Sequence, residues 1–185
     1  ASAATVPPAT GADGAMRQVT FSTWERTVLT PVELSHLPKS TFWVLLAVFL
    51  LSGIGTTVFS LHDAWYRGLM AFTAYVAGIL AGAVAAPILL PWIPGRAFAL
   101  KGAISGVVAG LLVVVAFKGV LIWLETAALL LITVAISSYL AMNFTGSTPY
   151  TSPSGVEKEM KCAIPLQAGA TLVAIVAWIT AGFVG

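Results

Sequence analysis

The chain has 185 residues, of which 58% are hydrophobic and only 9% charged, and its formal net charge is +2. Soluble domains carry about 25% charged residues, and so small a positive charge does not indicate a partner that is a nucleic acid. A single cysteine excludes an internal disulfide, a cysteine-rich zinc site and an iron–sulfur cluster held by this chain alone. Apolar runs of about 20 residues repeat along the sequence, which indicates an integral membrane protein embedded in a lipid bilayer.

The first 40 residues precede the long apolar runs. Residues 1–20 are rich in Ala, Thr, Pro and Gly, which is typical of a flexible linker. Residues 21–40 contain two capping-box spacings, Ser22 with Glu25 and Thr30 with Glu33. These spacings predict two short amphipathic helices, which would lie in the membrane interface or pack against another domain.

Residues 41–185 contain five apolar runs, which predict five membrane-spanning helices. The expected fold class is therefore all-α: an integral membrane bundle of five transmembrane helices, preceded by short amphipathic interfacial helices. Pro87 should kink the second span or end it early. We place the spans near residues 41–60, 65–90, 97–117, 119–142 and 164–184.

Basic residues predict the orientation of the bundle. If the N-terminus is cytoplasmic, seven Lys and Arg residues lie on the inside and only Arg67 and Lys118 on the outside. We therefore expect a multi-pass protein of a bacterial or archaeal cytoplasmic membrane, with its C-terminus outside. Aromatic residues near the predicted helix ends fit an interfacial belt: Trp43, Trp65, Tyr66, Trp92, Trp123 and Tyr139.

Small residues recur every four positions on the second and third spans. This spacing forms a groove that lets two helix backbones approach closely, and we expect the two stripes to face each other. The residues are Ala74, Gly78, Gly82 and Ala86 on the second span, and Gly102, Gly106 and Gly110 on the third.

The polar segment 143–163 is expected to be a cytoplasmic loop between the last two spans. Its prolines and glycines favour turns, and the capping-box spacing of Ser154 and Glu157 predicts a helix start at Gly155. The loop could bind an anion, but docking to a cytoplasmic domain is the favoured interpretation. The candidate docking residues are Asn143, Thr145, Gly146, Ser147, Thr148, Pro149, Tyr150, Thr151, Ser152, Ser154, Gly155, Glu157 and Lys158.

Glu125 is an acid well inside a predicted span. An ionisable group at this depth is a candidate for a proton or ion path. The alternative is a structural role, in which Glu125 reaches the interface or pairs with Lys118 or Arg67.

Cys162 follows Lys158 and Lys161 at the inner end of the last span. Nearby cations favour a thiolate, which is a nucleophile and a soft-metal ligand. The alternative is a small buried hydrophobic side chain, which is the usual role of a free cysteine.

The two histidines offer little chemistry. His62 and Asp63 are too few ligands for a metal site, and Asp63 is spaced to form an i, i+4 ion pair with Arg67. His36 has no obvious partner.

Three segments resemble the membrane region of the HgcA family, the corrinoid proteins of microbial mercury methylation. The resemblance extends over residues 16–185 and includes the number of predicted spans. Its most specific part is the string at 141–160. The segments are Met-Arg-Gln-Val-Thr-Phe (16–21), Leu-Thr-Pro-Val-Glu-Leu (29–34) and Ala-Met-Asn-Phe-Thr-Gly-Ser-Thr-Pro-Tyr-Thr-Ser-Pro-Ser-Gly-Val-Glu-Lys-Glu-Met (141–160).

The resemblance implies chemistry that takes place outside this chain. In the family, an N-terminal cytoplasmic domain binds a corrinoid (cobalamin) and passes a methyl group from cobalt to Hg(II), giving methylmercury. A ferredoxin-like partner, HgcB, uses two [4Fe–4S] clusters to return the cobalt to its reduced state, and the methyl supply is linked to folate-dependent one-carbon metabolism. On this interpretation, residues 1–20 join the spans to the corrinoid domain.

The chain departs from the family pattern at the catalytic cysteine. The family's cobalt-facing cysteine lies in an Asn-Trp-Cys-Ala motif, which this sequence lacks. Cys162 lies in Met-Lys-Cys-Ala-Ile-Pro and is not its counterpart. No catalytic or cofactor-binding residue is therefore carried over, and the chain alone is not expected to act as a methyltransferase.

The expected function is to anchor the corrinoid domain and its ferredoxin partner against the inner loops 91–101 and 143–161. A sharper hypothesis gives Cys162 a part in relaying Hg(II) or methylmercury. Two other classes stay open: a structural membrane subunit of a redox complex, and a small transporter or channel subunit. A transporter would need a polar path through Thr73, Ser105, Glu125, Thr126 and Thr133.

Overall fold

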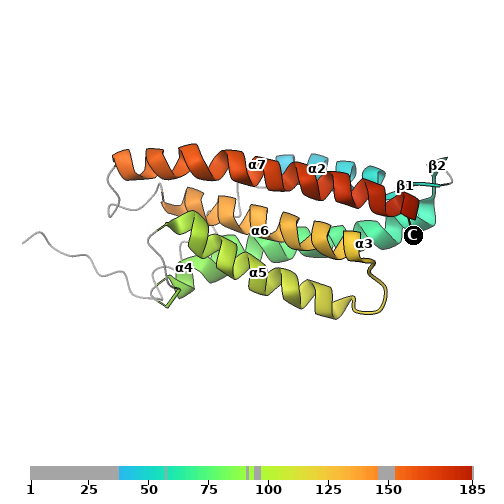
Figure 1. Ribbon diagram of the computed structural model, residues 1–185, viewed down its shortest axis with the longest axis horizontal. Coiled ribbons are helices and arrows are strands. Elements are labelled where there is room, and N and C mark those ends of the chain that lie inside the picture. The colour runs from blue at the N-terminus through green and yellow to red at the C-terminus, as the bar shows by residue number, and fades with distance from the viewer. Residues whose placement is uncertain (1–37, 57, 91, 94–96, 146–152, 185) are drawn as a thin grey trace, which may run out of the picture.

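The computed structural model describes residues 38–56, 58–90, 92–93, 97–145 and 153–184. The predicted linker and interfacial helices before residue 38 lie outside this part of the chain. The described part is a bundle of long helices with one very short β-hairpin (Figure 1). The mostly helical fold confirms the all-α class, and four helical segments are long and apolar enough to cross a membrane.

The long helices lie side by side and alternate in direction (Figure 1). The β-hairpin, residues 117–122 and the C-terminus gather at one end of the bundle, which we call the hairpin end. The opposite end, which we call the α4 end, contains α4 and the first turns of α5 and α7. In chain order the elements are α2 (Pro38–Ser52), β1 (Ile54–Gly55), β2 (Val58–Phe59), α3 (Leu61–Ile79), the π-helix η1 (Leu80–Ala85), α4 (Ala86–Leu89), α5 (Phe98–Ala116), α6 (Trp123–Thr145) and α7 (Pro153–Val184).

The first predicted span is shorter than expected. Helix α2 ends at Ser52 rather than near residue 60, and β1 and β2 then pair in antiparallel register, with Ile54 opposite Phe59. The 15 residues of α2 extend roughly 22 Å, whereas the hydrocarbon core of a bilayer is about 30 Å thick. The described residues therefore contain four full-length candidate spans and one shorter apolar helix.

The second span is one helical run, from Leu61 through α3, η1 and α4 to Leu89. The Ser60 hydroxyl caps its start by accepting a hydrogen bond from the Asp63 N–H at 3.2 Å. The predicted disturbance at Pro87 takes the form of the π-helix directly before it. Proline has no N–H to donate, and a π-helical turn is one way in which a helix absorbs such an interruption.

The segment 143–163 was expected to be a loop that passes into a helix at Gly155, but every described residue of it is helical. Helix α6 continues to Thr145, and α7 begins at Pro153, so that residues 153–163 are helical. Proline is well suited to the first turn of a helix, where its missing N–H would have no partner. The prolines that favoured a loop therefore include one that starts a helix, two residues before the predicted start at Gly155.

The two small-residue stripes do pack tightly, but the expectation that they face each other is wrong. Both face α6. A Cβ added at Gly82 would come within 2.6 Å of the Ser137 carbonyl oxygen, and one at Gly102 within 2.7 Å of the same atom. The atoms nearest to Gly78, Gly106 and Gly110 also belong to α6. Helix α6 is thus the central helix, in contact with α3, η1, α5 and α7.

Hydroxyl groups reinforce this close packing. Ser137 Oγ donates to the Gly102 carbonyl at 2.6 Å, and Thr133 Oγ1 lies 3.3 Å from the Ala74 carbonyl. Ser105 Oγ lies 3.2 Å from the Ala81 carbonyl, which links α5 to η1. Short polar side chains that bond across closely spaced helices are typical of membrane bundles.

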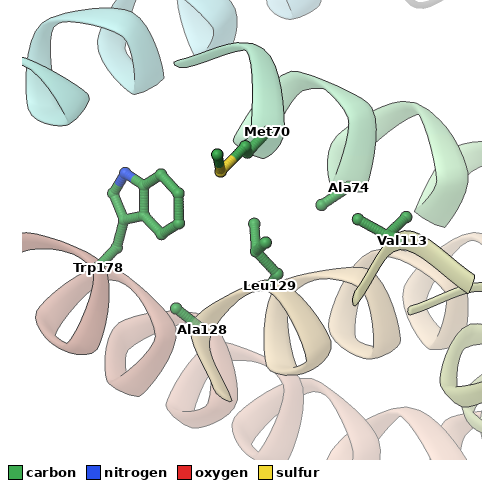
Figure 2. Close-up of a cluster of buried hydrophobic side chains, with 6 residues drawn as sticks. All are labelled: Met70, Ala74, Val113, Ala128, Leu129 and Trp178. Atoms are coloured by element: carbon green, nitrogen blue, oxygen red, sulfur yellow. The ribbon is translucent and has the colours of Figure 1, made fainter. Parts of the chain in front are cut away.

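Larger apolar side chains fill the space between the helices towards the hairpin end. Figure 2 shows Met70 and Leu129 pointing towards the indole ring of Trp178. Contact between these side chains joins α3, α6 and α7 in a buried layer. The cluster consists of Met70 and Ala74 from α3, Val113 from α5, Ala128 and Leu129 from α6, and Trp178 from α7.

Candidate functional site

A buried ion pair connects α3 to the start of α6. Arg67 Nε donates to Glu125 Oε1 at 2.9 Å, and the two side chains are only 11% and 10% exposed. Glu125 Oε2 also accepts the Ile122 N–H at 3.3 Å, directly before α6 begins. The carboxylate therefore closes the first turn of α6 and neutralises Arg67 at the same time.

The remaining Arg67 nitrogens bind α2 and α7. One terminal nitrogen donates to the Ser52 carbonyl at 3.3 Å, and the other donates to the Trp178 carbonyl. The guanidinium carbon also lies 4.7 Å from the centre of the Trp178 ring, where a cation–π attraction acts. Trp178 Nε1 donates to Ser52 Oγ at 3.0 Å. We call Arg67, Glu125, Ser52 and Trp178 the Arg67 cluster.

The Arg67 cluster fastens four helices together at the hairpin end. Each nitrogen of the guanidinium has an acceptor, and both carboxylate oxygens have a donor. The backbone of α7 also lies close to the Arg67 side chain at Gly182. A Cβ on Gly182 would collide with Arg67 and with the Ile54 carbonyl, so this position requires glycine. This arrangement favours the structural interpretation of Glu125, with Arg67 as the partner and not the exposed Lys118.

The expected ion pair between Asp63 and Arg67 is wrong. Both belong to α3, but Arg67 turns inwards to Glu125, whereas Asp63 is exposed and lies 3.6 Å from the exposed His62. Nowhere in the described ranges do three or more His, Cys, Asp or Glu side chains gather as metal ligands. His36 lies outside the described residues.

A second set of polar contacts holds the α4 end together. Glu159 Oε1, on α7, accepts the Ala99 N–H in the first turn of α5 at 2.6 Å. Lys101 Nζ, on α5, donates to the Leu90 carbonyl just beyond α4 at 2.7 Å. These two bonds fix the start of α7 and the end of α4 to the start of α5. The first of them comes from within the 141–160 string.

The candidate docking residues fall into three groups. Asn143 is exposed near the end of α6, and Thr145 is the last residue of that helix. Residues 146–152 lie outside the described part of the chain, so the calls on Gly146, Ser147, Thr148, Pro149, Tyr150, Thr151 and Ser152 stay predictions. Ser154, Gly155, Glu157 and Lys158 belong to the first turns of α7, where Glu157 and Lys158 are exposed and Glu157 pairs with Lys161 at 2.7 Å.

Cys162 is exposed on α7, which contradicts its interpretation as a small buried hydrophobic side chain. An accessible thiol at this end of the helix is compatible with a soft-metal ligand, but the sequence contains no second cysteine to provide another thiolate. The mercury relay stays a prediction.

The proposed transporter path has little support in the bonding of its residues. Thr73, Thr126 and Thr133 each donate to the carbonyl four residues earlier on their own helix. Ser105 bonds to nearby carbonyls, and Glu125 bonds to Arg67. Of these residues, Ser105, Thr133 and Glu125 also bond to another helix, whereas Thr73 and Thr126 bond within their own helices.

Sequence reasoning missed four residues whose side chains form hydrogen bonds between helices: Ser52, Glu159, Trp178 and Gln167, whose Nε2 donates to Ser138 Oγ at 2.9 Å. Trp178 could have been noticed because it stands in the interior of a predicted span, whereas the other aromatic residues considered lie near helix ends. Gln167 is similarly conspicuous, as an amide within an apolar run. The partners of Ser52 and Glu159 are distant in sequence, and no local pattern indicates them.

Comparisons of the chain with protein-family models, with curated proteins and with solved structures found no match.

Proposed function

We propose that this chain is the membrane domain of an HgcA-like corrinoid methyltransferase, which converts Hg(II) to methylmercury. Its function would be to anchor the cytoplasmic corrinoid domain and to hold the ferredoxin-like HgcB partner nearby. The resemblance of residues 141–160 to the family motivates the proposal. One contact supports the anchoring role. The Ala99 N–H donates a hydrogen bond to Glu159, which fixes residues 141–160 to the rest of the bundle at the α4 end.

We further propose that α2 is a fifth membrane helix and that the α4 end faces the cytoplasm. Exposed basic residues support this orientation. Lys158 and Lys161 lie exposed near the α4 end, whereas at the hairpin end Lys118 is exposed and Arg67 is buried in an ion pair. The positive-inside tendency counts the residues in short loops and near helix ends, so the α4 end is the better candidate for the inner side. The short α2 would be accommodated by local thinning of the bilayer.

Cys162 provides a direct test of this orientation, because it is exposed and is the only cysteine in the sequence. A membrane-impermeant maleimide should label it in inside-out vesicles but not in right-side-out vesicles. The reverse result would place the α4 end outside. A variant with Cys162 replaced by Ser gives the background labelling.

The proposed function itself is tested on the intact gene product, purified from its native membrane with any bound partner. We expect about one cobalt atom per chain and the absorption spectrum of a corrinoid, together with formation of methylmercury from isotopically labelled Hg(II). A stable membrane complex without cobalt would contradict the proposal and favour a structural subunit of a redox complex.

Within that system, replacing Glu159 with Ala should slow mercury methylation. Loss of a charge-assisted hydrogen bond costs about 1.5–3 kcal/mol, which can reposition the start of α7 and lower the methylation rate about tenfold. The matched control is Glu157→Ala, two residues away, because Glu157 forms only an exposed pair with Lys161. Both variants should retain their corrinoid, as measured by absorption. Equal methylation rates in the two variants would show that the contact between Glu159 and Ala99 does not affect methylation.

A further inference from the structure

The β-hairpin carries exposed apolar side chains at the hairpin end of the bundle. Val58 is 83% exposed, Phe59 is 43% exposed, and Leu61, which begins α3, is 72% exposed. We call these three residues the hairpin patch. A cluster of exposed apolar side chains marks a surface that contacts a membrane or another molecule. The height of the patch relative to the bilayer therefore indicates which partner it has.

The hairpin is fixed to the bundle and bonds its own backbone. Gly55 pairs with Val58, and the Ser60 N–H donates to the Gly53 carbonyl at 2.9 Å. A Cβ on Gly55 would come within 2.8 Å of the Gly182 carbonyl oxygen, so the hairpin packs closely against the last turn of α7 (Figure 1). Backbone paired in this way is compatible with the membrane interface, whereas irregular backbone that faces lipid does not occur in the hydrocarbon core.

Two tryptophans mark the height of the membrane boundary on α3 and α6. Both helices begin at the hairpin end, and the ion pair between Arg67 and Glu125 fixes their relative height. Trp65 and Trp123 each precede a member of this pair by two residues, and they are 70% and 74% exposed. Exposed tryptophans at one height on neighbouring helices are typical of the membrane–water interface.

The start of α3 lies within the interfacial layer by this measure. Leu61 precedes Trp65 by four residues, which correspond to roughly 6 Å along a helix. Each interfacial layer is about 5–8 Å thick, because the whole bilayer is about 40–45 Å thick and its hydrocarbon core about 30 Å. The residues that follow Leu61, His62 and Asp63, are exposed and polar, which fits lipid headgroups and does not fit hydrocarbon.

Val58 carries its apolar side chain in an unfavourable backbone conformation. Its φ of 68° is in the left-handed region, which is disfavoured for a β-branched residue and is usually occupied by glycine or asparagine. Packing within the chain does not explain a valine here, since most of the side chain is exposed. Contact with lipid does explain it, because removing apolar surface from water is favourable.

We propose that the hairpin patch lies in the membrane interface and contacts the lipid acyl chains next to the headgroups. Its partner is the lipid surface at the hairpin end of the bundle. The hairpin follows α2 directly, so this contact adds apolar surface to a helix that extends only roughly 22 Å. The proposal requires only that the bundle lies in a membrane, and it does not depend on methyl transfer.

A fluorescent label at position 58 tests the proposal in the purified chain. Val58→Cys, combined with Cys162→Ser, leaves one thiol for an environment-sensitive nitrobenzoxadiazole label. The chain is then reconstituted into vesicles of dioleoylphosphatidylcholine that contain a nitroxide on either carbon 5 or carbon 12 of an acyl chain. We expect stronger quenching from carbon 5, which is nearer to the headgroups, and little quenching by iodide in the surrounding water.

Two control variants, also with Cys162→Ser, calibrate the depth. Leu172→Cys labels an exposed site on α7 ten residues before Gly182, where quenching from carbon 12 should be stronger. Lys158→Cys labels an exposed site at the α4 end, where iodide should quench strongly. Circular dichroism checks that each variant is folded.

Three outcomes would overturn the proposal. A label at position 58 that iodide quenches as strongly as the label at position 158 would place the hairpin patch in water. A label shielded from iodide and from both nitroxides would indicate a protein partner. A label quenched in the same way as that at position 172 would place the hairpin in the hydrocarbon core.

Discussion

Replacing Arg67 with leucine is expected to destabilise the folded chain by about 3–5 kcal/mol, because Glu125 would remain buried without its partner. The same substitution removes the bonds to the carbonyls of Ser52 and Trp178, so that contacts to α2 and α7 are lost together with the contact to α6. Unfolding in mixed detergent micelles, followed by circular dichroism, measures the difference.

Two further variants separate charge from contact in the Arg67 cluster. The double variant Arg67→Leu with Glu125→Leu should recover most of the lost stability, because it leaves no buried charge. Asp63→Asn is the control, since Asp63 is exposed and its replacement should change the unfolding free energy by less than about 0.5 kcal/mol. If Arg67→Leu were no less stable than this control, the contacts of the Arg67 cluster would not stabilise the packing of the four helices.

Replacing Gly106 with leucine should force α5 away from α6. A Cβ at this position would lie 2.8 Å from Val134 Cα and 2.9 Å from Ser137 Cβ, and neither atom is the end of a flexible side chain. Overpacking of this kind typically costs about 1–3 kcal/mol, and a contact with backbone should reach the upper part of that range. The same unfolding measurement applies.

Gly169→Leu is the matched control for Gly106→Leu. It adds the same side chain on α7, where nothing lies within 4 Å of the added Cβ. Its stability should equal or slightly exceed that of the wild-type chain, because glycine is a poor helix former. Equal destabilisation by both variants would contradict the role assigned to close packing around α6.

The sequence predicts the helices of this bundle better than it predicts their neighbours. Runs of apolar residues place α5 and α6 within a few residues of their observed bounds, because a membrane span needs a minimum apolar length. The four-residue spacing of glycines likewise shows which face of a helix is packed. The spacing does not show which helix packs against that face. Both stripes face α6, whose contact surface includes Thr133 and Ser137 and carries no glycine pattern.

The candidate site was predicted only in part, for a similar reason. Glu125 is evident as an acid within a span, and Arg67 was one of two partners considered. The i, i+4 rule wrongly favoured Asp63 for Arg67, because a local ion pair at a surface is weak beside a buried one with several hydrogen bonds. The contacts to Ser52 and Trp178 join residues that are 15 and 111 positions away from Arg67, and only the folded bundle brings them together.

The distance along the chain between Arg67 and Glu125 has a consequence for biogenesis. The two residues are 58 positions apart. At a synthesis rate of about 5–20 residues per second, Arg67 emerges roughly 3–12 seconds before its counter-ion is made. During that interval the arginine must stay at the aqueous surface, which its place near the beginning of α3 allows. Helix α3 would therefore reach its final position only after α6 has been made. The Trp178 carbonyl on α7 would be the last acceptor to bind Arg67.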